Sequence, residues 1–196
     1  TRREAASGRL FCCPAAADPM SVLSRNHFEL FGLPVRFEID TAALDAAYRG
    51  VQGAVHPDRH AGGTAADRRV AMQLATHANE AYRTLRDPAR RGAYLCALAG
   101  VDVEFESNTA MPAQFLMQQI EWREALDDAR AARSAAGLQA LREGLEEARD
   151  ALLARLARAI DADGDYVEAA GDLRQMMFLD RFSAEIDDAE ERLLEA

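Results

Sequence analysis

Four residues of types that do chemistry stand together in one short stretch of this sequence: His56, Pro57, Asp58 and His60. The two histidines have the H-x-x-x-H spacing of a zinc-protease helix, which raises the question of a metal hydrolase. That motif requires a glutamate, which is absent, and Pro57 is incompatible with a regular helix across the pair. We therefore expect neither a metal nor catalysis here. We expect an exposed loop that offers an imidazole, a stiffened backbone and a carboxylate to a binding partner.

The acidic stretch from Asp161 to Asp165, taken with Asp172, has the outline of a calcium-binding loop. Such a loop needs glycine at its sixth position and glutamate at its twelfth. Here Gly164 is fourth and the twelfth residue is Asp172. We interpret the stretch as a polar turn between two helices.

The three cysteines indicate a reducing compartment rather than a disulfide framework. Cys12 and Cys13 are adjacent, which is not the spacing of a zinc knuckle, so we assign no metal to them. Cys96 lies among Tyr94, Leu95 and other apolar residues, which predicts a buried structural thiol.

Two predicted helices hold the loop that contains the histidines. The first has Asp40 or Thr41 as its N-cap and should end at the loop, because proline disfavours helical geometry in the residue before it. The second opens at Thr64, with Asp67 three residues later as in a capping box, and continues to about Arg86. The two helices are expected to run antiparallel, with the loop at their tip. Their core-facing residues are Leu44, Tyr48, Val51 and Val55 on the first and Val70, Leu74, Ala78, Ala81, Tyr82 and Leu85 on the second.

Two shorter helical segments flank this pair. The stretch 27–34 holds two phenylalanines and is stopped by a glycine and a proline. Asp87 and Pro88 have the order of an N-cap and a first helical residue, and open a helix that ends at Gly100. Residues 26–100 are therefore expected to form one helical domain.

The second half of the sequence predicts a small helical bundle. Residues 101–110 lack a helical period and form the predicted linker. Pro112 opens a long helix, Gly137 marks a break, a second helix continues to about Ile160, and a third runs from about Tyr166 to the end. Three long helices with short connections make an antiparallel bundle, so the predicted fold class is all-α.

The helix that begins at Pro112 carries two opposed apolar faces. An amphipathic helix needs one apolar stripe for its core, so the second must be covered by something else. The alternatives are packing against the N-terminal domain and binding a partner. On the last helix, Phe178 flanks the core stripe. At 100° per residue, the core side holds Phe115, Trp122, Leu126 and Ala129, and the other side holds Leu116, Met117 and Ile120.

The tripeptide His56-Pro57-Asp58 between two antiparallel helices resembles the J-domain, the module through which co-chaperones stimulate DnaK-type ATPases. Over residues 26–196 the chain resembles one J-protein family, HscB, the co-chaperone of iron–sulfur cluster assembly. General J-proteins carry a Gly/Phe-rich linker and often Cys-rich repeats, and this sequence has neither. The matching stretches are Phe28-x-Leu30-Phe31-Gly32-Leu33-Pro34, Asn79-x-Ala81-Tyr82-x-Thr84-Leu85-Arg86-x-Pro88, Arg91-x-x-Tyr94-Leu95, Phe115-Leu116-Met117-x-Gln119 and Phe178-Leu179-Asp180.

The resemblance implies a J-domain at 26–100, a linker at 101–110 and a three-helix bundle at 111–196 that binds the scaffold protein. The J-domain would engage an HscA- or DnaK-type ATPase, and the bundle would deliver an IscU-type scaffold to it, without catalysis or a cofactor. A J-protein with another client is the alternative. The implied chaperone-binding residues are His56, Pro57, Asp58, Arg49 and Arg59, and the implied scaffold-binding residues are Leu116, Met117, Ile120 and Phe178.

Charge and composition exclude other classes of function. The net charge is −10, and residues 101–196 alone carry −13, which disfavours nucleic acid and anionic membranes. All basic residues are arginine, so lysine-dependent catalysis is excluded, and no apolar run is long enough to span a membrane. Residues 1–25 are expected to be a disordered extension, or, over 1–19, translated sequence upstream of a start at Met20. The expected compartment is the bacterial cytoplasm. The alternative is the mitochondrial matrix, since three arginines near the start would also suit a transit peptide.

Overall fold

The computed structural model describes residues 25–55, 64–103 and 111–195 of the 196-residue chain, and within these ranges all regular structure is helical. The predicted N-terminal extension, the His56-Pro57-Asp58 loop and most of the predicted linker lie outside the described residues. No helix in the described part of the chain combines the length and apolar character that a bilayer crossing requires.

The first two described helices begin at residues with clear capping chemistry. Helix α2 (His27–Phe31) starts at Asn26, which forms a reciprocal capping box with Glu29. It ends at Gly32, whose φ of +65° lies in the left-handed region that glycine tolerates. Helix α3 (Thr41–Val55) starts at Asp40, whose carboxylate accepts the backbone N–H groups of the second and third helical residues.

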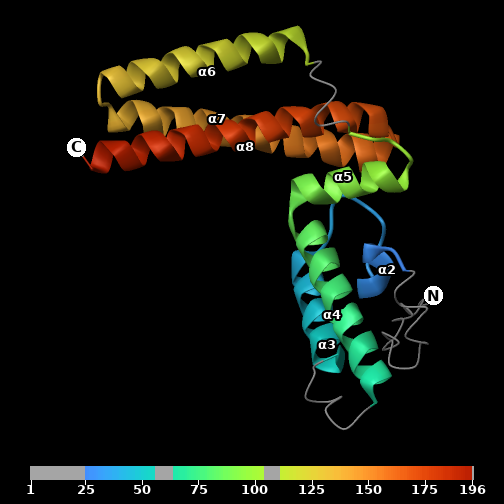
Figure 1. The fold of residues 1–196 in the computed structure, drawn as a ribbon. Coiled ribbons are helices and arrows are strands. Elements are labelled where there is room, and N and C mark those ends of the chain that lie inside the picture. The colour runs from blue at the N-terminus through green and yellow to red at the C-terminus, as the bar shows by residue number, and fades with distance from the viewer. Residues whose placement is uncertain (1–24, 56–63, 104–110, 196) are drawn as a thin grey trace, which may run out of the picture.

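Helices α3 and α4 form the predicted antiparallel hairpin. Helix α4 (Ala65–Arg86) begins with the predicted capping box of Thr64 and Asp67. Inside the hairpin, the rings of Tyr48 and Tyr82 stack with their centroids 4.1 Å apart. The Tyr82 hydroxyl donates to the carboxylate of Asp45 across the pair, at 2.9 Å. Figure 1 shows this hairpin standing crosswise to the long helices that follow.

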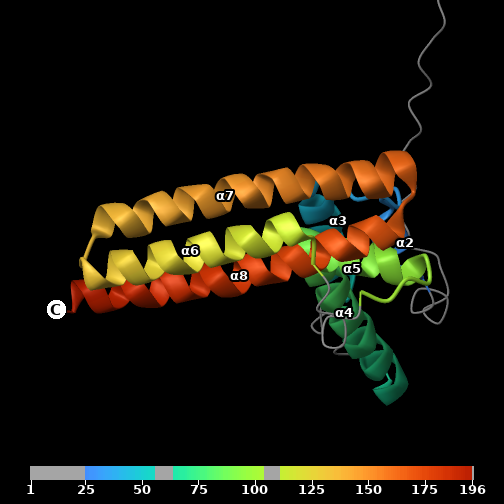
Figure 2. The ribbon, with the colours of Figure 1, turned by 90° about the horizontal axis from the view of Figure 1, so that it is seen from above.

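Three long helices build the bundle. They are α6 (Ala113–Ala131), α7 (Ala135–Arg158) and α8 (Tyr166–Leu194), with a π-helical turn η2 (Ala159–Asp163) after α7. Figure 2 shows the three long helices running alongside one another. Apolar residues of all three meet in the interior, among them Trp122, Leu126, Leu141, Leu145, Leu156, Met176, Phe182 and Ile186.

The break between α6 and α7 is not at Gly137, contrary to the sequence prediction. The chain turns at residues 132–134, where Arg133 has a φ of +47° and Ser134 caps the next helix. Gly137 lies in the first turn of α7, where a Cβ atom would come 3.1 Å from the Cβ of Ala129. The glycine therefore allows α6 and α7 to approach closely, rather than ending a helix.

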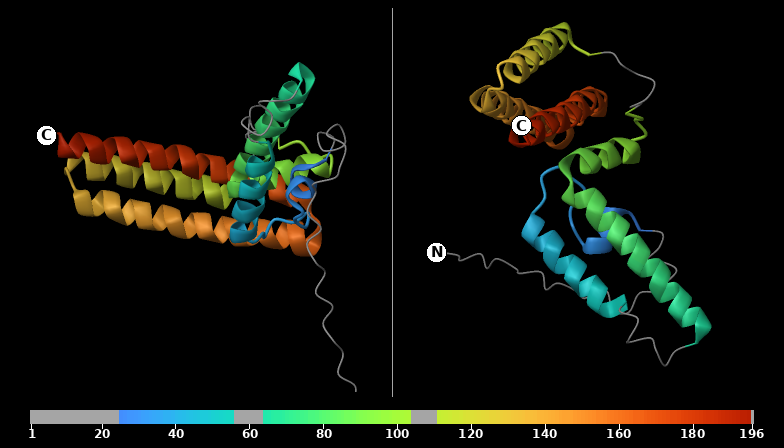
Figure 3. Two further views of the ribbon diagram at one scale, coloured as in Figure 1. Left: turned by 90° about the horizontal axis from the view of Figure 1, so that it is seen from below. Right: turned by 60° about the vertical axis from the view of Figure 1, so that its left-hand side comes forward.

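Helix α5 (Pro88–Leu98) joins the hairpin to the bundle. Asp87 is its N-cap and Pro88 its first residue, as predicted, and its buried face includes Leu95 and Cys96. This face packs against α8, so the apolar core continues from the hairpin into the bundle. The right-hand view of Figure 3 shows α5 lying between the two parts.

Candidate binding surfaces

Three large apolar side chains lie exposed together on the first half of α6. The exposed fractions are 45% for Leu116, 64% for Met117 and 58% for Ile120. They occupy positions i, i+1 and i+4 of one helix, so they share one face, called here the α6 apolar face. Large apolar side chains gathered in this way are typical of a site that another protein covers.

The other side of α6 supplies the bundle core. Trp122, Leu126 and Ala129 are buried, and Phe115 is half-buried. The predicted division of this helix into two opposed faces is therefore confirmed. The α6 apolar face is not covered by any described part of the hairpin, so the alternative of packing against the N-terminal domain is wrong for the described residues.

Phe178 differs from the three residues of the α6 apolar face because it is half-buried in an aromatic cluster. Its ring stacks on Phe182 at 5.8 Å between centroids and on Trp122 at 6.4 Å, and meets Phe115 edge-on at 5.7 Å. The guanidinium of Arg123 lies 5.8 Å above the same ring. Phe178 therefore contributes to the packing of α6 on α8 as well as to the surface beside it.

Acidic side chains continue the α6 apolar face toward the middle of the helix. Glu121 and Glu124 are exposed and stand four and seven residues after Met117, so they lie on the same side of the helix. The amide of Gln118 donates to the Glu121 carboxylate at 3.0 Å. The sequence analysis did not select these glutamates, although their helical spacing from Met117 could have identified them.

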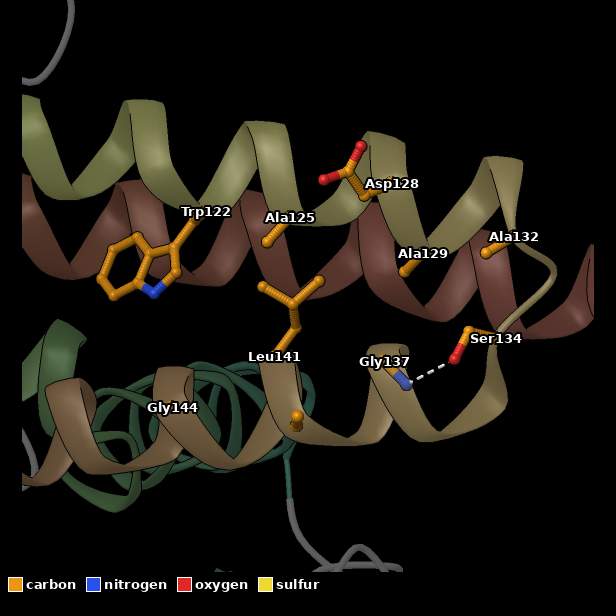
Figure 4. A pocket seen from close by; sticks show the side chains of 10 residues that line it. Trp122, Ala125, Asp128, Ala129, Ala132, Ser134, Gly137, Leu141 and Gly144 are labelled. Carbon is orange, nitrogen blue, oxygen red and sulfur yellow. Dashed lines mark hydrogen bonds between the residues drawn. The ribbon is translucent and has the colours of Figure 1, made fainter.

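A shallow cavity of about 510 Å³ lies between α6 and α7 on a different side of α6. Small residues line it, including Ala125, Ala129 and Gly144, with Trp122 and Leu141 at its floor. Figure 4 shows these side chains between the two helices, with Ser134 accepting the N–H of Gly137 at one end. Asp128 is the single charged residue among those that line it, with no second titratable group beside it in the lining, so we assign no site to the cavity.

The second predicted surface is the hairpin tip, which the structure describes in part. Arg49 is exposed on α3. His56, Pro57, Asp58 and Arg59 lie outside the described residues, so their predicted role stays a prediction. Figure 1 shows α3, the helix that carries Arg49, and α6 in different parts of the molecule.

The described residues contain no cluster of three or more histidine, cysteine or acidic side chains that could hold a metal. Cys96 is buried, as predicted, and burial raises the pKa of its thiol to about 11. The acidic stretch after α7 is a turn, as predicted, but Asp161 is engaged with the N-terminal half, where its carboxylate accepts the N–H of Phe37 at 2.6 Å.

One carboxyl group is buried between α7 and α8. Asp172 is 1% exposed and pairs with Arg155, while the amide of Gln175 donates to it at 3.2 Å. Burial raises the pKa of Asp172 to about 6, and the positive charge of Arg155 partly opposes that shift.

Known proteins similar to this chain are co-chaperones. Residues 111–187 match the family described as the HSCB C-terminal oligomerisation domain. A protein named co-chaperone protein HscB homolog from Burkholderia multivorans is 52% identical over 174 residues, which cover 89% of this chain and 99% of that protein. A protein of the same name from Bordetella pertussis is 53% identical over 165 residues, covering 84% of this chain and 96% of that protein.

Two solved structures resemble the fold. Chaperone HscB from Vibrio cholerae superposes with a TM-score of 0.74 at 35% identity, covering 86% of this chain and 99% of that one. The human co-chaperone protein HscB superposes with a TM-score of 0.78 at 27% identity, covering 95% of this chain and 93% of that one.

Proposed function

This chain belongs to the HscB family of co-chaperones, and from that premise we propose that it recruits an IscU-type iron–sulfur scaffold to an HscA- or DnaK-type ATPase. The bundle would hold the scaffold, and the J-domain hairpin would stimulate ATP hydrolysis. The protein itself would act as an adaptor without catalysis. The two relatives named above are bacterial, and we propose the bacterial cytoplasm as the compartment of this protein.

The observation that carries this proposal is the α6 apolar face. Leu116, Met117 and Ile120 are more than two-fifths exposed on a helix whose other side already buries Trp122 and Leu126. Nothing in the packing of the bundle requires large apolar residues there. Their removal from water by a partner would be favourable by roughly 25 cal/mol for each Å² buried.

The surroundings of this face indicate the chemistry of the partner surface. The face is bordered by Glu121 and Glu124 on α6, and by Phe178 where α8 lies beside it. A complementary surface would offer an apolar depression with basic residues next to it. Such acidic rims act mainly on the rate of association and on the choice of partner.

The J-domain hairpin would supply the second activity. Its tip carries His56-Pro57-Asp58, the motif on which the family resemblance was first based. Joining the two binding surfaces in one chain raises the effective concentration of scaffold near the ATPase. Hydrolysis would then be stimulated most strongly when scaffold is bound.

The test is calorimetric titration of the scaffold into the variant with Leu116, Met117 and Ile120 all changed to Ala. We expect scaffold binding to weaken by about 30-fold or more, since truncating a central hot-spot contact costs at least about 2 kcal/mol. Stimulation of the ATPase without scaffold should be unchanged, because the hairpin is untouched.

The matched control truncates three other exposed apolar residues, Leu98, Val167 and Leu194, to Ala. It removes a similar amount of exposed apolar surface away from α6 and should bind scaffold normally. Equal loss in both triple variants would point to a general effect of surface hydrophobicity. Full binding by the α6 variant would place the scaffold site elsewhere.

A further inference from the structure

The connection between α2 and α3 is held against the bundle by one carboxylate. Asp161, in the π-helical turn after α7, accepts the backbone N–H of Phe37 at 2.6 Å and that of Glu38 at 2.9 Å. The guanidinium of Arg36 lies 3.4 Å from the same carboxylate. The Asp161 side chain is 12% exposed, so these charge-assisted hydrogen bonds are largely shielded from water.

The segment that Asp161 holds is packed into the junction of the two halves. Phe37 is 3% exposed, and the guanidinium of Arg91 on α5 lies 5.0 Å over its ring. A Cβ atom on Gly92 would come 3.4 Å from the Phe37 ring and 2.9 Å from the Leu173 side chain on α8. The segment, α5 and α8 therefore meet here in close contact.

Among the described residues, two stretches of the chain join the hairpin to the bundle, one after α4 and one before α3. The first is the apolar face of α5 against α8. A helix packed on another helix can still slide and rock through small shear motions. The second attachment is the contact of Asp161 with residues 36–38, which lead directly into α3 at Thr41. Because the two attachments lie on different elements, together they oppose a rotation of the hairpin relative to the bundle that either one alone would permit.

Extending the proposed function, on which this inference rests, we propose that Asp161 is a positioning residue for scaffold delivery. It fixes the angle between the α3–α4 hairpin and the bundle, and so the place of a bound scaffold relative to the ATPase. Asp161 itself touches neither partner. An orientation that exists before binding keeps the effective concentration of the second partner high. Loss of Asp161 should therefore leave binding to the scaffold alone and to the ATPase alone unchanged. It should weaken the stimulation of ATP hydrolysis that requires both partners.

The substitution that tests this role is Asp161→Asn. It keeps the shape of the side chain but replaces one accepting oxygen with a donor, so at least one of the two backbone N–H groups loses its acceptor. The matched control is Asp163→Asn, in the same turn. Asp163 pairs with Arg158, whereas the hydrogen bonds to residues 36–38 come from Asp161. The two variants thus differ in whether the junction is altered.

The first readout is the distribution of distances between two spin labels in the full chain. The labels are placed at Ala46→Cys on α3 and Ala154→Cys on α7, both exposed, with Cys12 and Cys13 changed to Ser and buried Cys96 retained. We expect a narrow distribution in the parent and in Asp163→Asn, and a broadened or shifted one in Asp161→Asn. An unchanged distribution in Asp161→Asn overturns the proposal.

The second readout is ATPase stimulation with and without scaffold. In Asp161→Asn, the affinity for each separate partner should stay within about twofold of the parent. The extra stimulation that scaffold causes should fall by about tenfold. A broadened distribution with full scaffold-dependent stimulation would show that delivery does not depend on the angle. If the parent shows no scaffold-dependent stimulation, the proposed function fails, while the distance distributions still decide whether Asp161 fixes the angle.

A third measurement needs no variant and remains decisive if Asp161→Asn does not fold. In the parent protein, the backbone amides of Phe37 and Glu38 should exchange with deuterium much more slowly than those of other loop residues. Both lie outside regular helix, so slow exchange would come from their bonds to Asp161. Rapid exchange of both amides would overturn the proposal.

Discussion

The ring of Phe178 is stacked on the indole of Trp122, with centroids 6.4 Å apart and planes inclined by 15°. This contact separates Phe178 from the three α6 residues with which the sequence analysis grouped it. Trp122 is 8% exposed and belongs to the bundle core, so Phe178 is tied to that core through its ring. The proposed scaffold surface therefore combines free side chains with one that also stabilises the fold.

That difference predicts unequal costs of truncation. Phe178→Ala should lower the free energy of unfolding by about 2 kcal/mol, because it opens a space beside Trp122 and Phe182. Each of the single changes Leu116→Ala and Met117→Ala should alter it by no more than about 0.5 kcal/mol. Urea unfolding followed by circular dichroism measures all three. A Phe178→Ala variant as stable as the parent would contradict the packing role of this ring.

The loop motif predicts a loss of activity without a loss of fold. If His56 acts by contact with the ATPase, His56→Gln should abolish stimulation of hydrolysis and leave the melting temperature unchanged. Steady-state ATPase assays and thermal melts are the two measurements. Full stimulation by this variant would remove the loop from the mechanism, and a lowered melting temperature would identify His56 as a packing residue.

We predict that Arg49 affects the rate of association with the ATPase, and that the effect depends on salt concentration. J-domains usually carry several basic residues on the helix before the loop, and here Arg49 is nearly alone. Arg49→Ala should slow association with the ATPase at low salt, and the difference from the parent should shrink near 1 M salt, where charges are screened beyond about 3 Å. Stopped-flow kinetics give both rates. A difference that persists at high salt would indicate a direct, desolvated contact.

We predict that Asp172 makes the free energy of unfolding depend on pH within a limited pH range. Its pKa is about 6 in the folded protein against 3.8 for an unperturbed aspartate, so the folded state binds the proton more tightly than the unfolded chain. Its favourable contribution is therefore present at low pH and is lost as pH rises toward about 6, by at most roughly 3 kcal/mol.

The comparison with Asp172→Asn isolates that contribution, because the variant keeps every other carboxylate. The stability of the parent relative to the variant should fall between about pH 4 and 6 and stay constant above about pH 7. Urea unfolding at a series of pH values measures it. A difference that rises over this window would show that Arg155, rather than burial, dominates at Asp172.

The fold class predicted from the sequence is confirmed: an all-α J-domain followed by a three-helix bundle. The signals that succeeded are local ones. Asp40, Thr64 and Asp87 cap the helices that follow them because a cap depends on residues two or three positions away. The division of α6 into two faces follows from helical periodicity alone, so the exposed Leu116 was also predictable.

The features that were missed depend on residues far apart in the chain. Asp161 was interpreted as part of a polar turn, because the N–H groups it accepts belong to residues more than 120 positions away. Gly137 was interpreted as a helix break, since its contact with Ala129 across the α6–α7 pair leaves no local pattern. Spacing along one helix likewise could not show that Phe178 stacks on Trp122.

Helix α5 follows the hairpin in chain order, yet its buried face completes the bundle. Leu95 and Cys96 belong to the same continuous core as Leu173 and Met176 on α8. A gene fragment ending at Gly100 would encode the hairpin and α5 without α8, so the buried face of α5 would be exposed to water. The complementary fragment would expose the surface of α8 that packs against α5. Recombination between relatives should therefore disturb the core less when the crossover lies before Asp87 than when it lies at Gly100, since α5 then stays with the bundle that buries it.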